Sequence, residues 1–175
     1  GAMWMTRNDG NKWFDISDGL PLKKIVSIQA SAHKASRVFV VCKGMDDDDP
    51  KPYVFVSENF GRNWKSIVSN LPSIPVNCLL EDPGIEELIF VGTDAGIFLS
   101  SDQGSSWESI SLQLPTASIH QLEFMKNSQF LLAASHGQGL FYCHLDGVKK
   151  FIKSGNPDEY KLLASLPGQL PRTKD

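Results

Sequence analysis

Hydrophobic and polar positions along this chain repeat three times in register with a tryptophan. The tryptophans are Trp13, Trp64 and Trp107. Apolar residues follow each of them at the same four distances, and a proline stands eight residues after each. The apolar positions hold Ile16, Ile67 and Ile110, then Leu20, Leu71 and Leu114, then Ile25, Val76 and Ile119, and finally Ile28, Leu79 and Leu122. A pattern kept at so many positions in three copies indicates an internal repeat.

The segments between the tryptophans predict short β-strands. They are rich in β-branched and aromatic residues, and turn-forming residues separate them. We expect strands over residues 26–32, 37–43, 53–57 and 64–68 in one repeat, and over 77–81, 87–92, 96–100 and 107–111 in the next. Four antiparallel strands in a unit of about 40 to 50 residues are typical of a β-propeller blade. A helical period occurs only over residues 157–166.

Each tryptophan closes an octad of the form S/T-x-D/N-x-G-x-x-W, which predicts a tight turn. The defining residues are Thr6, Asn8, Gly10 and Trp13, then Ser57, Asn59, Gly61 and Trp64, and then Ser100, Asp102, Gly104 and Trp107. The Asp or Asn side chain can accept hydrogen bonds from N–H groups of the turn, and the glycine can adopt a positive φ. We expect the tryptophan to begin the return strand and to bury its ring. A fourth copy is decayed, because Leu145 takes the Asp position.

The octads resemble the Asp-box, or BNR repeat, of sialidase-type and sortilin-type propellers, xyloglucanases and photosystem II assembly factors. Residues 91–98 and 134–141 are also similar to segments of the sortilin-type bacterial BNR proteins and glycosyl-hydrolase-like propellers. The resemblance covers residues 4–147. It implies an all-β fold of four-stranded antiparallel blades with Asp-box turns. The predicted strands are enough for about three and a half such blades, and we expect them to be part of a larger propeller. The resemblance also implies that the octads are structural, because family members bind ligands on the opposite face.

Composition narrows the classes of partner. The 175 residues are 41% apolar and 21% charged, and the formal net charge is −3, as is typical of a soluble globular protein. No single-sign charge field favours nucleic acid, and no apolar run is long enough to insert into a membrane. Three widely spaced cysteines suit buried free thiols rather than disulfides or a zinc site, namely Cys42, Cys78 and Cys143. We therefore expect no metal and no cofactor.

The ends of the chain differ from its repeats. Residues 1–3 are interpreted as the remnant of a cleaved expression tag, residues 4–147 as the propeller blades, and residues 148–175 as a C-terminal extension or linker. Three and a half blades can form an arc of a larger ring, pair with a second copy, or close as an unusual small ring. We favour the arc, which is completed by the remaining blades of a parent protein, in an extracytoplasmic location (secreted, periplasmic or cell surface).

Candidate ligand contacts lie on the loops opposite the octads. They are Lys23, Asp47, Asp94, His136 and Gln138. Two of them have alternatives: the acidic run around Asp47 also suits a solvated insertion, and His136 also suits a locally hydrogen-bonded turn residue. No catalytic residue is assigned, because the four arginines cannot form a sialidase pocket and no nucleophile, phosphate-loop or zinc motif occurs.

These observations favour a non-catalytic interaction module that binds a protein or a glycan through its upper-face loops. One alternative is the C-terminal part of a glycoside hydrolase of the BNR or xyloglucanase type, with catalytic residues partly outside this chain. A second alternative is an assembly factor of the photosystem II type. Nucleic acid and membrane insertion are not expected.

Overall fold

A computed structural model describes residues 1–44, 48–110, 117–125 and 130–145, and these residues form an all-β structure without helices. Its strands are β1 (Trp4–Thr6), β2 (Trp13–Asp15), β3 (Lys24–Ala30), β4 (Val38–Lys43), β5 (Tyr53–Ser57), β6 (Lys65–Ser66), β7 (Val76–Glu81), β8 (Ile89–Thr93), β9 (Gly96–Ser100), β10 (Glu108–Ser109), β11 (Ile119–Phe124), β12 (Phe130–Ser135) and β13 (Gly139–His144). The eight strands predicted for the two complete repeats are confirmed, with ends shifted by a few residues.

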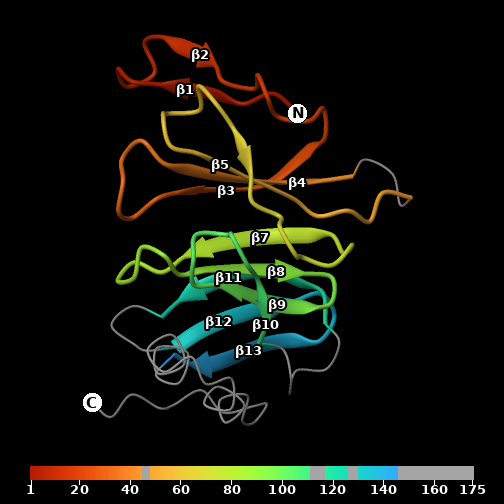
Figure 1. Ribbon diagram of the computed structural model, residues 1–175. Helices are drawn as coiled ribbons and strands as arrows, with labels where there is room; N and C mark the ends of the chain where they lie inside the picture. The colour runs from red at the N-terminus through yellow and green to blue at the C-terminus, as the bar shows by residue number, and fades with distance from the viewer. Residues whose placement is uncertain (45–47, 111–116, 126–129, 146–175) are drawn as a thin grey trace.

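The strands form four antiparallel sheets that follow one another along the chain. Two sheets are complete, in the orders β3-β4-β5-β6 and β7-β8-β9-β10, and a three-stranded sheet follows in the order β11-β12-β13. A two-stranded hairpin, β1-β2, precedes them. Figure 1 shows the sheets stacked in chain order, with β1 and β2 at one end of the stack and β13 at the other. This is the architecture of successive β-propeller blades.

Strand register defines two faces of the stack. Lys24 pairs with Lys43, Val76 with Thr93 and Ile119 with Ser135, so these ends of the strands lie on one side. The loops on this side enter the first strand of each sheet or connect its second and third strands, and we call this side the upper face. The octads connect the third and fourth strands at the opposite ends. We call that side the octad face.

The octad turns have the same hydrogen bonds in all three copies. The Asn8, Asn59 or Asp102 Oδ1 atom accepts a hydrogen bond from the backbone N–H four residues later, at 2.9, 3.0 and 2.8 Å respectively. The hydroxyl that opens each octad accepts a hydrogen bond from the octad glycine N–H at 2.7 to 3.0 Å. Each octad glycine has a positive φ, between 79° and 88°, and so does the residue before it. Since that glycine φ is strained for any residue with a Cβ, glycine is required at this position.

A repeated joint connects neighbouring blades. The Trp64 indole N–H donates to the Ile16 carbonyl at 2.9 Å, and the Trp107 indole N–H donates to the Ile67 carbonyl at 2.8 Å. In each joint the octad glycine lies against the isoleucine whose carbonyl accepts the tryptophan N–H. A Cβ atom built on Gly61 or Gly104 would approach that isoleucine side chain to 2.5 or 2.8 Å. The octads therefore fix each blade to the preceding blade.

The prediction that every octad tryptophan buries its ring is wrong for the first copy. Trp107 is buried and Trp64 is partly buried, but Trp13 is 55% exposed. Its hairpin has no preceding blade among the described residues, so the ring has no isoleucine to cover. Burial therefore depends on the neighbouring blade and not on the octad alone.

Other expectations concern single residues and the chain ends. Cys42 and Cys78 are buried free thiols, and burial raises the pKa of Cys78 to about 12. The Cys143 side chain, residues 157–166 and the proposed 148–175 extension lie outside the described structure. Met3, assigned from the sequence to a tag remnant, packs in a hydrophobic cluster with Ile16 and Val40.

Candidate functional site

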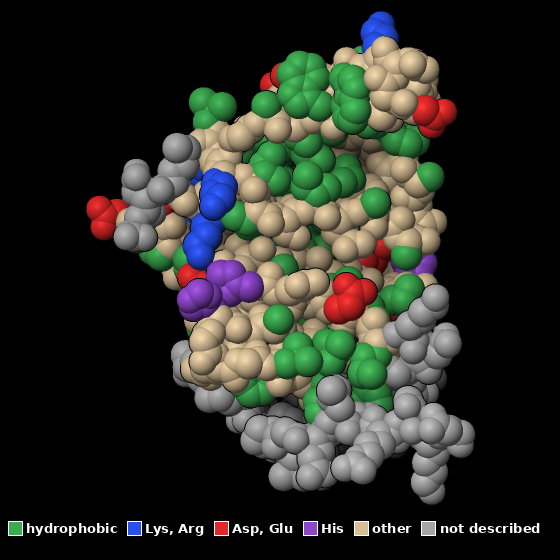
Figure 2. Space-filling view, turned by 180° about the vertical axis from the view of Figure 1, so that it is seen from behind, with side chains coloured by type: hydrophobic (Ala, Val, Ile, Leu, Met, Phe, Trp, Pro, Cys, Tyr) green, Lys and Arg blue, Asp and Glu red, His purple; other side chains and the backbone are tan. Residues whose placement is uncertain are grey.

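A polar network crosses three sheets on the upper face. It contains Lys43 at the end of β4, Asn77 in β7, Asp94 in the β8–β9 turn, Ser118 before β11 and His120 in β11. Figure 2 shows lysine or arginine side chains beside a pair of histidine side chains on one flank of the molecule. The network therefore lies where three blades meet, at the ends of their first and second strands.

β-Bulges determine the position of two members of this network. The register of the first strand shifts at the same repeat position in every blade, and the extra residues are Val26, Asn77 and His120. A bulge re-aims the side chain of the extra residue and is common next to functional sites. In two of the three blades that residue is polar and joins the network.

Asp94 is the central acceptor. Its Oδ1 atom accepts hydrogen bonds from Asn77 Nδ2 at 2.7 Å and from Ser118 Oγ at 2.6 Å. Its Oδ2 atom lies 3.4 Å from the Lys43 ammonium, which also donates to Asn77 Oδ1 at 3.0 Å. Burial alone would raise the pKa of Asp94, but the donated hydrogen bonds and the Lys43 charge outweigh it and hold this pKa below its ordinary value. Asp94 therefore remains a carboxylate at neutral pH.

Two imidazoles extend the network beyond Asp94. Ser118 Oγ lies 3.0 Å from His120 Nε2, and the His120 and His136 rings have centroids 5.5 Å apart. The His136 backbone N–H donates to the Ser118 carbonyl at 2.9 Å, which fixes the β12–β13 turn against the start of β11. Both imidazole rings are on exposed residues. They can offer donors and acceptors to a bound molecule.

Lys23 belongs to a second cluster on the same face. Its ammonium forms an ion pair with Asp49 and lies 4.6 Å from the centre of the Tyr53 ring. The Tyr53 hydroxyl contacts both Asp49 carboxylate oxygens at 3.1 Å. The hydrogen bond with Asp49 raises the pKa of Lys23, and the same contact lowers the pKa of Asp49.

The structure places the five predicted ligand contacts as follows. Asp94 and His136 are connected through Ser118 and His120, while Lys23 belongs to the Asp49 cluster. Gln138 is exposed in the same turn as His136, and Asp47 lies outside the described residues. The sequence analysis missed Lys43, Asn77, Ser118 and His120. The available signal was the polar residue at the bulge position, thirteen residues after Trp64 and Trp107.

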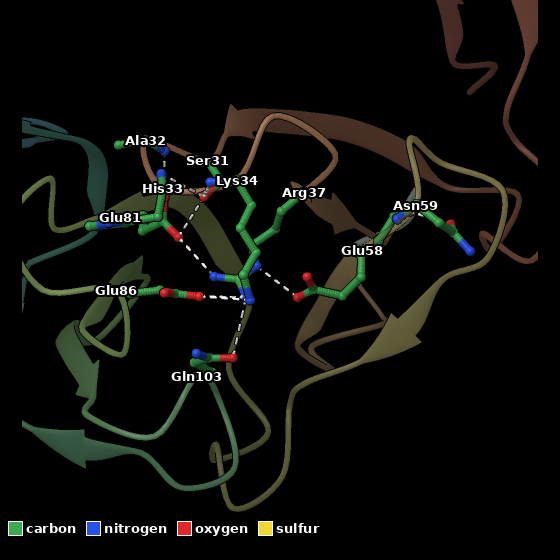
Figure 3. Close-up of polar contacts among 11 residues, drawn as sticks. Ser31, Ala32, His33, Lys34, Arg37, Glu58, Asn59, Glu81, Glu86 and Gln103 are labelled. Atoms are coloured by element: carbon green, nitrogen blue, oxygen red, sulfur yellow. Dashed lines mark hydrogen bonds and ion pairs between the residues drawn. The ribbon is translucent and has the colours of Figure 1, made fainter.

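A buried arginine cluster on the octad face was also missed. The Arg37 side chain is 1% exposed and pairs with Glu58 at 2.7 Å, with Glu86 at 3.0 Å and with Glu81 at 3.4 Å. Figure 3 shows the guanidinium between these three carboxylates, with Gln103 beside the Nη2 atom that also pairs with Glu86. Glu81 is fully buried and also accepts from the Ala32 N–H at 2.7 Å. Because its carboxylates come from two blades, the cluster connects these blades at their joint.

A cavity of about 320 Å³ opens beside Arg37 on the octad face. Its lining includes Glu58 and Asp102 from two octads, together with the Trp64 side chain. Glu58 and Asp102 already bond to Arg37 and to turn groups, so the cavity walls belong to the inter-blade joint.

The described residues contain no group of three His, Cys, Asp or Glu side chains placed to hold a metal ion. No helix among them has the length and apolar character needed to cross a bilayer.

Comparisons with known proteins identify the fold. The sequence matches no protein-family model and no curated protein. The structure is similar to a GH74 enzyme of Niastella koreensis, with a TM-score of 0.61, 15% identity and 82% of this chain covered. It is similar to a GH74 xyloglucanase of Xanthomonas campestris, with a TM-score of 0.53, 16% identity and 67% covered. It is also similar to YCF48 bound to a D1 peptide, with a TM-score of 0.55, 19% identity and 81% covered.

The solved structures are β-propellers, so the predicted fold class is confirmed. This chain spans 24% and 22% of the two GH74 chains and 44% of the YCF48 chain. Identities this low support the fold and not the activity.

Proposed function

We propose that this chain is a segment of an Asp-box β-propeller and a non-catalytic interaction module, whose upper face binds a peptide segment of a protein partner. The polar network around Asp94 is the observation that carries the proposal. It combines residues of three blades, and a contact surface shared by several blades is typical of ligand binding by repeat proteins. The three octads with identical turn hydrogen bonds support the Asp-box assignment.

The chemistry of the network suits a peptide backbone. Lys43 and the two imidazoles supply donors, while Asp94 and the imidazoles supply acceptors, and both kinds of group are needed to pair with peptide N–H and C=O groups. The paired charges of Lys43 and Asp94 leave little net charge, which favours neutral polar groups over a highly charged ligand. YCF48, a propeller of similar fold, is found with a D1 peptide, and this supports a protein partner.

A glycan is a weaker candidate for the same surface. Sugar rings stack on exposed aromatic side chains, but the strongly exposed aromatics among the described residues are Trp4, Trp13, Phe14 and Phe60. They lie in the hairpin and in the octads, away from Asp94. Tyr53 is on the upper face, where its ring already contacts Lys23 and its hydroxyl contacts Asp49.

The glycoside hydrolase alternative rests on the similarity to the GH74 enzymes. A glycosidase requires a carboxylic acid with a raised pKa as proton donor and a second carboxylate. The pKa of Asp94 is shifted in the opposite direction, which disfavours Asp94 as this proton donor. In this alternative, another carboxylic acid is the proton donor, and the catalytic residues lie partly outside this chain. Our proposal of a non-catalytic interaction module also keeps an extracytoplasmic location for the protein. It keeps the division of the chain into blades at 4–147 and an extension at 148–175.

Selection of peptides on the folded chain tests the proposal. The immobilised chain would be panned against a phage-displayed library of random peptides, and the dissociation constants of enriched peptides would be measured by calorimetry. We expect Asp94→Asn and His136→Ala to weaken binding at least about tenfold, since each removes hydrogen-bonding capacity from the contact surface.

Glu87→Gln is the matched control, because Glu87 is an exposed carboxylate in the loop between β7 and β8, on the octad face. It should leave the dissociation constant unchanged. A xyloglucan oligosaccharide would be titrated in parallel. Failure to enrich any peptide, or sugar binding that depends on Asp94, would overturn the peptide proposal.

A further inference from the structure

His120 and His136 occupy two repeat positions that meet on the upper face. One is the bulge residue of the first strand, and the other follows the last paired residue of the second strand. In the preceding sheet the same two positions hold Asn77 and Asp94. There the Asn77 amide donates to the Asp94 carboxylate at 2.7 Å, so a direct hydrogen bond connects the two positions. The two imidazoles, which both belong to the described part of the chain, share no hydrogen bond, and their ring centres are 5.5 Å apart.

The hydrogen bonds of Ser118 determine which nitrogen of His120 carries the proton. Ser118 Oγ lies 2.6 Å from Asp94 Oδ1, and a carboxylate only accepts hydrogen bonds, so the single hydroxyl proton points to Asp94. The Ser118 oxygen therefore accepts from His120, whose Nε2 atom is 3.0 Å away. Nε2 then carries the proton of the neutral ring, and the lone pair is on Nδ1.

Metal-binding histidines in proteins have this arrangement. Such a histidine almost always donates its second ring N–H to an oxygen atom, which fixes the tautomer and the orientation of the ring. Ser118 supplies that oxygen to His120, and Asp94 fixes Ser118 in turn. The His136 imidazole is exposed beside the His120 ring and has no hydrogen-bond partner among the described residues. Its ring nitrogens are therefore available as ligands.

The separation of the two rings fits one ion bound to both of them. For a Zn–N bond of about 2.1 Å, each ring centre is about 3.2 Å from the ion, and a tetrahedral angle places the two centres about 5.2 Å apart. The observed distance is 5.5 Å. The backbone holds this spacing, because Ile119 pairs with Ser135 across the strands. The His136 N–H also donates to the Ser118 carbonyl at 2.9 Å.

We propose that His120 and His136 form a binding site for a divalent transition-metal ion of the zinc class. His120 Nδ1 and one ring nitrogen of His136 are the protein ligands. Imidazole favours Zn²⁺, Ni²⁺ and Cu²⁺, whereas Mg²⁺ and Ca²⁺ prefer oxygen ligands. The described residues place no third ligand beside the pair, so water or a group of a bound molecule completes the coordination. This differs from the sequence-based expectation of no metal, because strand pairing and a bulge bring together two histidines that are distant in sequence.

Calorimetric titration of the full chain with Zn²⁺ alone tests the proposal, and it is independent of peptide binding because no peptide is present. We expect saturable binding that His120→Ala and His136→Ala each weaken at least about tenfold, since either change leaves a single imidazole. His33→Gln is the matched control and should leave the dissociation constant unchanged. His33 is a partly buried histidine on the octad face, and its Nε2 atom lies 2.7 Å from the Asp82 carbonyl oxygen. Absence of Zn²⁺ binding, or equal affinities of the original and His120→Ala chains, would overturn the proposal.

NMR of the imidazole nitrogens identifies the ligand atom. The metal-free chain should show His120 as the Nε2–H tautomer, and Zn²⁺ should shift its Nδ1 resonance. Ser118→Ala removes the acceptor of Nε2–H and keeps both imidazoles, and it should weaken Zn²⁺ binding about tenfold, as is usual when a metal-binding histidine loses such a partner. An Nδ1–H tautomer of His120 in the metal-free chain, or zinc-induced shifts confined to other histidines, would overturn the proposal.

Discussion

Trp107 is the buried tryptophan of the third octad, and its replacement by alanine tests how the blades are held together. Its side chain is 3% exposed, and its indole N–H donates to the Ile67 carbonyl at 2.8 Å. Its backbone is fixed as well, because Asn70 accepts from its N–H at 2.7 Å and donates to its carbonyl at 2.9 Å. The substitution removes the ring and the indole bond but leaves the two Asn70 bonds.

We expect Trp107→Ala to lower the free energy of unfolding by about 3 to 5 kcal/mol, the usual cost of truncating a buried aromatic residue. Trp107→Phe keeps most of the apolar volume but leaves the Ile67 carbonyl without its donor. That change should lower the free energy of unfolding by about 1 to 3 kcal/mol. Both expected losses of stability arise because the Trp107 ring is buried at the joint between blades and donates its indole N–H to the Ile67 carbonyl.

Trp13→Ala is the matched control, because Trp13 has the same octad position but is 55% exposed. It should change the free energy of unfolding by about 0.5 kcal/mol or less, as is usual at exposed sites. Urea unfolding followed by far-ultraviolet circular dichroism measures all three variants without relying on tryptophan emission. Equal losses for Trp13→Ala and Trp107→Ala would refute the reasoning, since burial against the preceding blade would then not matter.

Three further predictions concern the glycine, thiol and acid of the repeat. Gly104→Ala should lower the free energy of unfolding by at least about 1 kcal/mol more than Gly137→Ala. Both glycines have a positive φ, but only the Cβ atom added at Gly104 would meet a neighbour, the Ile67 side chain at 2.8 Å. Urea titration of the two variants measures the difference. Cys78 should resist a thiol reagent in the folded chain and react only on unfolding, since burial raises its pKa to about 12. Peptide mass mapping identifies the labelled cysteine, and rapid labelling of Cys78 in native buffer would contradict its burial. Burial alone would raise the pKa of Asp102, but the hydrogen bonds donated to its carboxylate outweigh burial and hold the folded pKa below 3.8. The resulting stabilisation is present above pH 3.8 and is lost as the pH falls through the folded pKa. Asp102→Asn should remove this pH-dependent loss, which urea titrations at several pH values measure.

The fold was predictable because its signals are local and repeated. The octads place the turns, and the spacing of Ile16, Ile67 and Ile110 marks the outer strands. β-Branched runs locate the other strands between them. Each blade repeats these signals, so errors in one copy are corrected by the others.

The candidate site was only partly predictable because it is assembled from three blades. Asp94 and His136 were accessible as loop residues, but the contact of Asp94 with Lys43 depends on the angle between sheets. Asn77 and His120 reach the upper face through a β-bulge, and its sequence signal, a polar residue thirteen positions after the tryptophan, is missing from the first repeat, which has Val26 there. The exposure of Trp13 has a similar origin, since it reflects the absence of a neighbouring blade among the described residues.

Mapping a selected peptide onto the chain by chemical-shift perturbation tests the central claim most directly. A peptide enriched on the chain would be titrated into isotopically labelled protein while the backbone and imidazole resonances are recorded. The account predicts that the largest shifts occur at Asp94, Ser118, His120 and His136, with little change at Asn59 in the octad turn. Shifts concentrated on the octad face, with the imidazole resonances of His120 and His136 unmoved, would contradict it.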